Sequence, residues 1–270
     1  DTISRNIANA STPGYTRKIM QPQTQVLAGV GVGVAPGILF RNVDKALIHD
    51  LNTQTGLVGY RNIRQRYYDS ILNFHGPSDA ERALSNQVGA LANAFTQLSA
   101  APDSQTLLNE TLSAATQTVG KIHDFANLIT SMRTQTETDI SAALVTVNQS
   151  LDTIAKLNAD IARYAEGGQS TADLEDQRDT AIKVVAQYFN ISTFPSGNQI
   201  IVTTKQGQTL ADTDAHHLFF QTSNILPTSY YPGGGLNGLT VDSNSGTDIT
   251  QTDLGGQIGA LFELRDTTLP

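Results

Sequence analysis

The strongest pattern in the chain is a series of apolar positions separated alternately by four and three residues. It starts at Leu108, reaches Ile129, takes one extra step of four near Leu144 and ends at Ile161. This spacing is a heptad repeat with one stutter, and it predicts a long helix that needs a partner along its whole length. At 1.5 Å per residue, a helix of roughly fifty-five residues would be about 80 Å long.

Three positions of this series carry polar side chains, namely Arg133, Thr136 and Asn158. A polar residue in a heptad seam can fix the register of the helices, and it can equally mark a local opening of a bundle. The pattern does not separate these two interpretations.

Further helices are predicted on both sides of the long one. Asp44 is suited to cap a helix that runs towards Phe74 and ends at residues 75–77. Ser78 and Glu81 form a capping box for a helix that ends before Pro102. After the turn at residues 164–168, Ser170 or Thr171 should cap a helix that returns antiparallel along the long one; its apolar residues are Leu174, Ala181, Ile182, Val185 and Tyr188.

From Asn190 onward the apolar period changes to two, which is typical of strands. Strands are expected at residues 190–194, 199–204, 208–210, 217–221 and 239–242, with turns at 196–198 and 206–207. Residues 258–264 again resemble a helix, heading back towards the bundle.

The first forty residues differ from both parts. Residues 1–10 look like the end of a helix, and Pro13 and Gly14 stop it. Residues 15–40 alternate short β-branched runs with Gly and Pro, which predicts an extended arm or a loose hairpin. Because the chain opens on such a helix end and closes abruptly at Pro270, we expect it to be an internal piece of a longer protein.

Together these patterns predict an α+β protein: a long antiparallel helical bundle or coiled coil, an irregular N-terminal arm, a smaller β-rich domain and a helix that returns to the bundle. The expected divisions are 1–43 for the arm, 44–189 for the helical domain, 190–254 for the β-rich domain and 255–270 for the returning helix.

Composition narrows the possible functions. The 270 residues carry a formal net charge of -8, which argues against nucleic acid, because phosphate binding needs clustered Lys and Arg. The negative charge gives no support for binding to an anionic membrane surface either. Cysteine is absent, so disulfides and thiolate metal sites are excluded. No signal peptide or membrane span is evident.

Candidate catalytic features are weak. The Gly-rich segment 29–34 lacks the Gly-Lys-Ser/Thr ending of a phosphate-binding loop. Asp173, Asp176 and Asp179 share one helix face, but Arg178 stands among them and acidic residues favour a helix N-terminus, so capping and salt bridges are the expected role. His216 and His217 should point to opposite sides of a strand. We therefore expect no enzyme and no cofactor.

Three motifs resemble those of a known family. Residues 6–17 resemble the signature N-I-A-N-x-x-T-P-G-Y-x-R of the axial proteins of the flagellar rod, hook and hook-associated set. Residues 173–179 resemble the D-L-x-D-Q-R-D helix of the hook-associated protein 1 family, and residues 255–266 its segment G-G-x-x-G-x-L-x-x-x-R-D. The order of the predicted parts also fits this family.

The resemblance implies a structural subunit at the hook–filament junction, exported by the flagellar type III apparatus to the cell exterior. Its expected partners are the hook protein, hook-associated protein 3 and further copies of itself in a ring. The family's export chaperone engages a C-terminal region that this chain lacks, and the chain by itself is expected to be monomeric.

The resemblance also assigns residue roles, some of them in the arm. The residues expected to contact neighbouring subunits are Asn6, Ile7, Asn9, Tyr15 and Arg17, and those that set the turn are Thr12, Pro13 and Gly14. Asp173, Asp176, Arg178 and Asp179 are expected to hold the returning helix to a neighbour by salt bridges and capping. Two alternatives stay open: another axial protein, such as the hook protein or hook-associated protein 3, or a coiled-coil surface adhesin.

Overall fold

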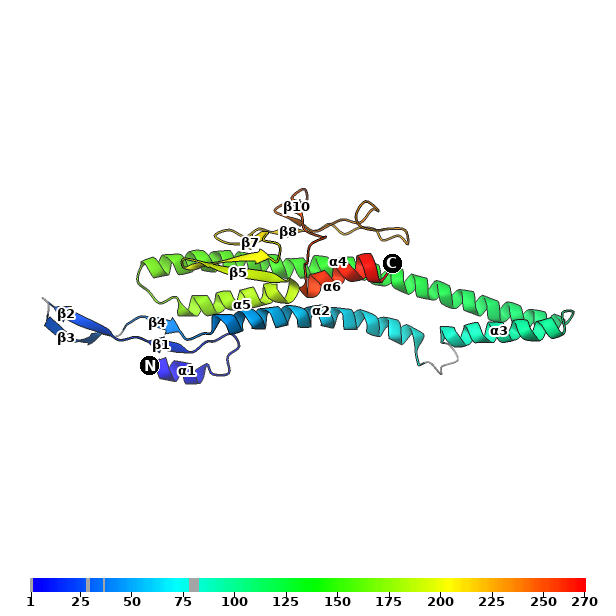
Figure 1. Ribbon diagram of the computed structural model, residues 1–270, viewed down its shortest axis with the longest axis horizontal. Helices are drawn as coiled ribbons and strands as arrows, with labels where there is room; N and C mark the ends of the chain where they lie inside the picture. Colours follow the sequence, from blue (N-terminus) through cyan, green and yellow to red (C-terminus); the bar gives the residue numbers. More distant parts are fainter. Residues whose placement is uncertain (1, 28–29, 36, 78–82) are drawn as a thin grey trace.

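The computed structural model describes residues 2–27, 30–35, 37–77 and 83–270. The capping box expected at Ser78 and Glu81 lies outside these residues. Figure 1 shows an elongated molecule in which the helices run nearly parallel to the long axis and the strands lie at one end and along one side. The α+β class and the helical bundle expected from the sequence are confirmed.

The N-terminal arm consists of a short helix and two small sheets. Helix α1 (Thr2–Ala8) is followed by β1 (Lys18–Met20), which pairs antiparallel with β4 (Leu39–Arg41). Between them, β2 (Gln23–Leu27) and β3 (Val30–Ala35) form a two-stranded ribbon that extends beyond the end of the helices in Figure 1.

Helix α4 (Gln105–Glu166) contains 62 residues and is the longest element. Helix α3 (Leu84–Ala100) packs antiparallel on its first part, and together they form a hairpin that projects to the right of the body in Figure 1. Helix α5 (Ala172–Tyr188) returns along its second part, as expected. Gly167 and Gly168 make the turn, and Gly168 has a φ of 65°, which favours glycine.

The second half of the predicted seam is correct: Ile140, Val147, Leu151 and Ile154 are fully buried. The first half is wrong by one residue. Leu112 and Val119 are exposed, and the neighbouring positions Thr111 and Thr118 face α3 instead.

The shift has a clear cause in the contacts of these threonines. Their hydroxyls lie 3.3 and 3.4 Å from the carbonyl oxygens of Ala94 and Gln87 on α3. The small threonine side chains let the backbones of α3 and α4 approach closely. The larger residues Leu112 and Val119 therefore lie beside the contact and not within it.

The polar seam positions are all buried. Arg133 and Asn158 have partners in the C-terminal third of the chain, whereas the Thr136 hydroxyl donates to the Arg133 carbonyl within α4. Asn158 donates to the carbonyl oxygens of Ile200 and Asp212, and Arg133 donates to those of Ser229 and Arg265. At Arg133 and Asn158 the seam of α4 therefore binds the C-terminal third of the chain, which agrees with openings in the bundle.

Helix α2 (Lys45–His75) begins at Asp44, whose carboxylate accepts hydrogen bonds from the amides of Ala46 and Leu47, as expected for a cap. Its buried face includes Gly56 and Gly59. A Cβ at Gly59 would lie 2.4 Å from the carbonyl oxygen of Gln187, so the helix packs against the end of α5 at backbone distance.

The C-terminal third contains two small antiparallel sheets. One joins β5 (Ile191–Ser196), β6 (Gln199–Thr204) and β7 (Thr209–Ala211); the other joins β8 (Leu218–Phe219), β9 (Thr240–Val241) and β10 (Thr247–Asp248). Helix α6 (Gly256–Glu263) and a π-helical turn, Leu264–Thr268, then lie against α2 and α4. Strand residues such as Val202 share one hydrophobic cluster with the helices.

The cap of α5 differs from the expectation. Thr171 occupies the cap position but accepts no backbone hydrogen bond there; its hydroxyl donates to Glu175 at 2.5 Å. Ser170 Oγ accepts only a long bond, 3.5 Å, from the amide of Ala172. The first turn of α5 is instead surrounded by the N-terminal arm.

Candidate functional site: the N-terminal arm and the acidic face of α5

The side chain of Asn6 connects helix α1 to strand β1 within the arm. Its amide nitrogen donates to the carbonyl oxygen of Lys18 at 2.8 Å, and its oxygen accepts from the Lys18 amide at 2.9 Å. This pairing is the one a neighbouring strand would make. The same oxygen accepts from the Tyr15 hydroxyl at 2.9 Å, so Asn6 holds α1 against β1.

The residues between α1 and β1 form a hydrogen-bonded turn. The amide of Thr12 donates to the Asn9 carbonyl, and that of Tyr15 donates to the Thr12 carbonyl. Gly14 has a φ of 81°, and a Cβ there would lie 2.5 Å from the Thr180 hydroxyl on α5. Glycine is needed for both reasons, the left-handed backbone and the close approach of the arm.

Three carboxylates on one face of α5 meet three cations of the arm. Asp173 pairs with Arg5 at 2.8 Å and Asp179 with Arg41 at 2.6 Å. Between them lies Asp176, the centre of the cluster, which pairs with both Lys18 and Arg41. We call these six residues, Arg5, Lys18, Arg41, Asp173, Asp176 and Asp179, the ionic anchor.

The centre of the anchor is buried and fully hydrogen-bonded. The Lys18 ammonium contacts Asp176 and donates to the Ala172 carbonyl at 3.0 Å. Asp176 also accepts from the amide and the hydroxyl of Thr16, at 3.0 and 2.5 Å. Burial opposes ionisation of Asp176, but the hydrogen bonds from Lys18, Thr16 and Arg41 outweigh it and lower its pKa below the usual value.

Arg41 completes the anchor from β4. Its Nε donates to Glu175 at 2.8 Å, and its Nη1 contacts both Asp176 and Asp179. Burial would lower the pKa of Arg41, and the surrounding carboxylates, Asp179 first, raise it instead. The guanidinium therefore stays charged and joins the sheet of the arm to α5.

Sequence reasoning found the acidic half of this anchor and missed the basic half. Arg5, Lys18 and Arg41 are spread over three elements without a common spacing, so no pattern in the sequence identifies them. In the sequence, only their positive charge distinguishes these three residues, because the arm carries few other ionisable side chains.

Arg178 is placed differently from its acidic neighbours. It points to the opposite side of α5, where its Nη1 donates to Asn158 Oδ1 and to the Asn198 carbonyl, both at 3.0 Å. Burial lowers its pKa. The expected salt bridge is not among its contacts in the described part of the chain; neutral acceptors on α4 and on the β5–β6 turn bind it instead.

A second buried ion pair joins α4 to the C-terminal turn. Arg265 is completely buried, and its Nη1 lies 2.8 Å from Glu137 and 2.9 Å from the Asn237 carbonyl. Its Nε also pairs with Asp266 at 2.6 Å. The sequence motif at residues 255–266 contained Arg265, but no helical or strand period could identify Glu137 as its partner.

Two of the other expected contact residues of the arm, Ile7 and Arg17, are open to solvent. Ile7 is 72% exposed and lies on the surface of α1. Arg17 is exposed too, whereas Asn9 is half-buried and donates to the Arg5 carbonyl. The structure thus separates the arm into residues that shape it and residues that face outward.

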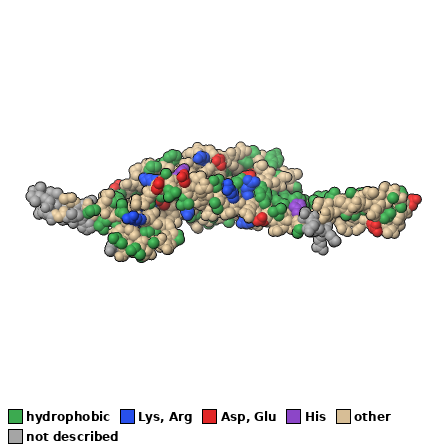
Figure 2. All heavy atoms as spheres, turned by 60° about the horizontal axis from the view of Figure 1, so that its bottom comes forward, with side chains coloured by type: hydrophobic (Ala, Val, Ile, Leu, Met, Phe, Trp, Pro, Cys, Tyr) green, Lys and Arg blue, Asp and Glu red, His purple; other side chains and the backbone are tan. Residues whose placement is uncertain are grey.

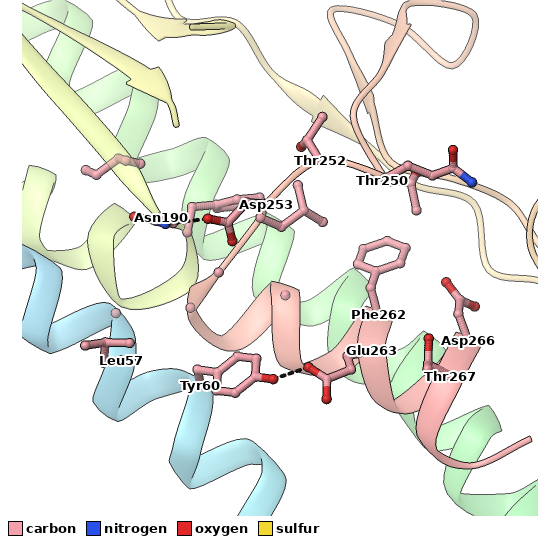
Figure 3. Close-up of a pocket in the computed structure, with 18 of the residues that line it drawn as sticks. Leu57, Tyr60, Asn190, Thr250, Thr252, Asp253, Phe262, Glu263, Asp266 and Thr267 are labelled. Atoms are coloured by element: carbon pink, nitrogen blue, oxygen red, sulfur yellow. Dashed lines mark hydrogen bonds between the residues drawn. The ribbon is translucent and has the colours of Figure 1, made fainter. Parts of the chain in front are cut away.

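A cleft of about 660 Å³ lies between α2, the α5–β5 junction and α6. Figure 3 shows the Tyr60 hydroxyl directed at Glu263, and the Asn190 side chain hydrogen-bonded to Asp253. Asp266 also lines it, but this carboxylate is held by Arg265. The carboxylates of the cleft are thus engaged in contacts within the chain.

Other features bear on function within the described ranges. No group of His, Asp and Glu there could hold a metal ion, and no helix there is long and apolar enough to cross a bilayer. His216 hydrogen-bonds to Asp242 and His217 to Asp152, so the two imidazoles face different neighbours. The expected strand does not include them, because β8 begins at Leu218.

Comparison with known proteins gives two findings. Residues 76–270 match the family model of the flagellar hook-associated protein FlgK helical domain. Among solved structures, the chain is similar to the flagellar hook junction protein FlgK from Burkholderia pseudomallei, with a TM-score of 0.63 and 17% identity. The similarity covers 81% of this chain and 38% of that one. No curated protein matches the chain.

Proposed function

The chain belongs to the FlgK family of flagellar hook-associated proteins, and from this premise we propose that it is part of a structural subunit joining the hook of the bacterial flagellum to its filament. The observation that carries the proposal is the family match over residues 76–270. The similar solved protein is described as a flagellar hook junction protein. The present chain spans 38% of its length, so the junction role of the whole protein is an inference from family.

The shape supports a mechanical role. Helix α4 has 62 residues, which at 1.5 Å per residue gives a rod of about 90 Å. Its second half is fixed by α5, α6 and the strands through one continuous hydrophobic cluster. Such an element can transmit force along an axis, and a joint between two polymers has no reaction to accelerate. The proposal therefore includes no catalysis and no cofactor.

The arm supplies the proposed contacts with neighbouring subunits. Ile7 and Arg17 face solvent, and we assign them direct contact. Asn6 and Tyr15 bond to one another, so their contribution would be to hold the arm in the shape that presents these residues. Asn9, Thr12, Pro13 and Gly14 form the turn that orients α1.

The proposed partners follow from the position at the junction. They are the hook protein on one side, hook-associated protein 3 on the other, and copies of the same subunit around the ring. The proposed location is extracellular, after export by the flagellar type III apparatus.

Complementation tests the proposal. The full-length gene that encodes this chain is expressed in a strain that lacks its FlgK, and filaments are counted by electron microscopy. We expect the wild type to restore filaments and Arg17→Ala to reduce them without a loss of secretion. Lys183→Ala, an exposed basic residue on α5, is the matched control and should behave as wild type. Failure of the wild type would contradict the proposal.

A further inference from the structure

The cleft between α2, the α5–β5 junction and α6 contains a buried polar side chain that the fold does not use. Asn52, on α2, lines this cleft and is only 9% exposed. Its side-chain amide forms no hydrogen bond to any residue in the described part of the chain. Because the large majority of buried polar side chains are hydrogen-bonded, Asn52 stands out as a donor and an acceptor that are open to a ligand in the cleft.

Three other asparagines show what such an amide binds in this protein. Each lies on a helix and pairs with both the N–H and the C=O of one strand residue: the pairs are Asn6 with Lys18, Asn148 with Leu218, and Asn158 with Ile200. Their donor–acceptor distances all lie between 2.8 and 3.0 Å. This is the pairing that a neighbouring strand would make. Asn52 offers the same two groups on α2 without a strand residue to bind.

The cleft has room for an extended segment. Its volume of about 660 Å³ falls in the range of roughly 300–1,000 Å³ that is usual for ligand sites. Figure 3 shows α2 on one side of it and the segment that leads into α6 on the other. Gly56, one turn after Asn52, and Gly255, just before α6, line the cleft without side chains, so a ligand can approach the backbone there.

The charge of the cleft favours a basic ligand. Its described lining includes the carboxylates of Asp253, Glu263 and Asp266 and contains no Lys or Arg. Glu263 and Asp266 each lie close to an arginine of the chain. Asp253 is exposed and bonds to the neutral side-chain amide of Asn190. No cation of the described residues pairs with Asp253, so its charge is available to a ligand.

We infer that this cleft binds an extended peptide segment that carries a Lys or Arg side chain. The N–H and C=O of one of its residues pair with Asn52, and the basic side chain pairs with Asp253. Backbone pairing supplies affinity and the side chain supplies selectivity, as in other sites that bind a peptide as an added strand. The inference goes beyond the proposed function and does not rest on it, because the arm is not part of the cleft.

Thermal unfolding of the 270-residue chain tests whether Asn52 is reserved for a ligand. Asn52→Leu keeps the approximate shape and removes an unpaired polar group, so the melting temperature should stay the same or rise. Asn148→Leu is the control: it removes both bonds to Leu218 and should lower the melting temperature by about 2–4 °C. An equal decrease for both variants would mean that Asn52 already has a structural partner, and would overturn the inference.

A nuclear magnetic resonance titration tests binding itself. The probe is the capped tripeptide acetyl-Ala-Lys-Ala-amide, added to the ¹⁵N-labelled chain at millimolar concentrations. We expect saturable shifts of the Asn52 side-chain amide and of the backbone amides of residues 250–256, with binding roughly tenfold weaker in Asn52→Leu. Asp253→Asn should weaken binding about two- to fivefold, and should not change binding of acetyl-Ala-Ala-Ala-amide. The absence of saturable shifts, or equal binding by Asn52→Leu, would overturn the inference.

The same measurements on the full-length protein identify the source of the peptide segment. If a neighbouring protein supplies it, the full-length protein binds the tripeptide as the 270-residue chain does, and Asn52→Leu leaves its melting temperature unchanged. If another part of the longer protein supplies it, the tripeptide is excluded and Asn52→Leu lowers the melting temperature. A full-length protein that neither binds the tripeptide nor loses stability in Asn52→Leu would overturn the inference.

Discussion

The ammonium group of Lys18 in the arm is buried against the carboxylate of Asp176 on α5, 158 residues later in the chain. Only 1% of the Lys18 side chain and 9% of the Asp176 side chain are exposed. Removing either partner of such a buried pair destabilises the fold, because the remaining charge is left without a partner and without water to solvate it. The attachment of the arm therefore depends chiefly on this pair.

Asp176→Asn should release the arm and destabilise the chain. The substitution keeps the shape but leaves Lys18 with only the more distant carboxylate of Asp173, 3.7 Å away, and loss of a buried partner costs about 3 kcal/mol. Urea unfolding and hydrogen exchange of the β1 amides measure the effect. Asp173→Asn is the control: its carboxylate is more than half exposed, pairs with the half-exposed Arg5 and lies 3.7 Å from Lys18, so the change should cost less than about 1 kcal/mol. Equal losses for both variants would contradict the central role of Asp176.

Lowering the pH should weaken the attachment of the arm to α5. The pKa of Asp176 is lower in the folded chain than in the unfolded one, so its contribution to stability is present above about pH 4 and is lost as the pH falls through the folded pKa. Exchange of the arm amides should accelerate over that range. In Asp176→Asn this dependence should be weaker, and an unchanged pH profile would count against the assignment.

Two glycine substitutions should have opposite effects. Gly59→Ala places a Cβ 2.4 Å from the Gln187 carbonyl, which should cost about 1–3 kcal/mol through overpacking. Gly89→Ala, in α3, meets no atom within 4 Å and should stabilise by about 0.5–1 kcal/mol, because alanine favours the helix. Thermal unfolding measures both. A neutral Gly59→Ala would mean that α2 and α5 are not in backbone contact.

Removal of Arg178 should destabilise the junction between helices and strands. Arg178→Ala leaves Asn158 Oδ1 and the Asn198 carbonyl each without one donor, and we expect a loss of about 1–3 kcal/mol. The melting temperature reports it. Lys183→Ala, on the exposed side of the same helix, should change stability by less than about 0.5 kcal/mol. An unchanged melting temperature for Arg178→Ala would refute this role.

Much of the helical architecture follows from the sequence, because its signals are local. The glycines at 167–168, the heptad from Ile140 to Ile161 and the Asp44 cap each act within a few residues, and each leads to the observed element. The antiparallel return of α5 is then required by the short turn.

The remaining features depend on contacts between distant segments. The α3–α4 contact uses Thr111 and Thr118 rather than the larger Leu112 and Val119, and no apolar period reveals a preference for hydroxyls that bond to a neighbouring backbone. The partners of Asp176 lie more than 130 residues away. Likewise, the pairing of Arg265 with Glu137 becomes visible only when the C-terminal turn is placed on α4.

Gold labelling of isolated flagella tests the central claim most directly. An epitope tag is inserted into the full-length protein at the exposed turn around Asn244, between β9 and β10, and the particles are located by electron microscopy. The account predicts label confined to a narrow zone where the hook meets the filament. Label along the filament, along the hook, or absent from the flagellum altogether would contradict it.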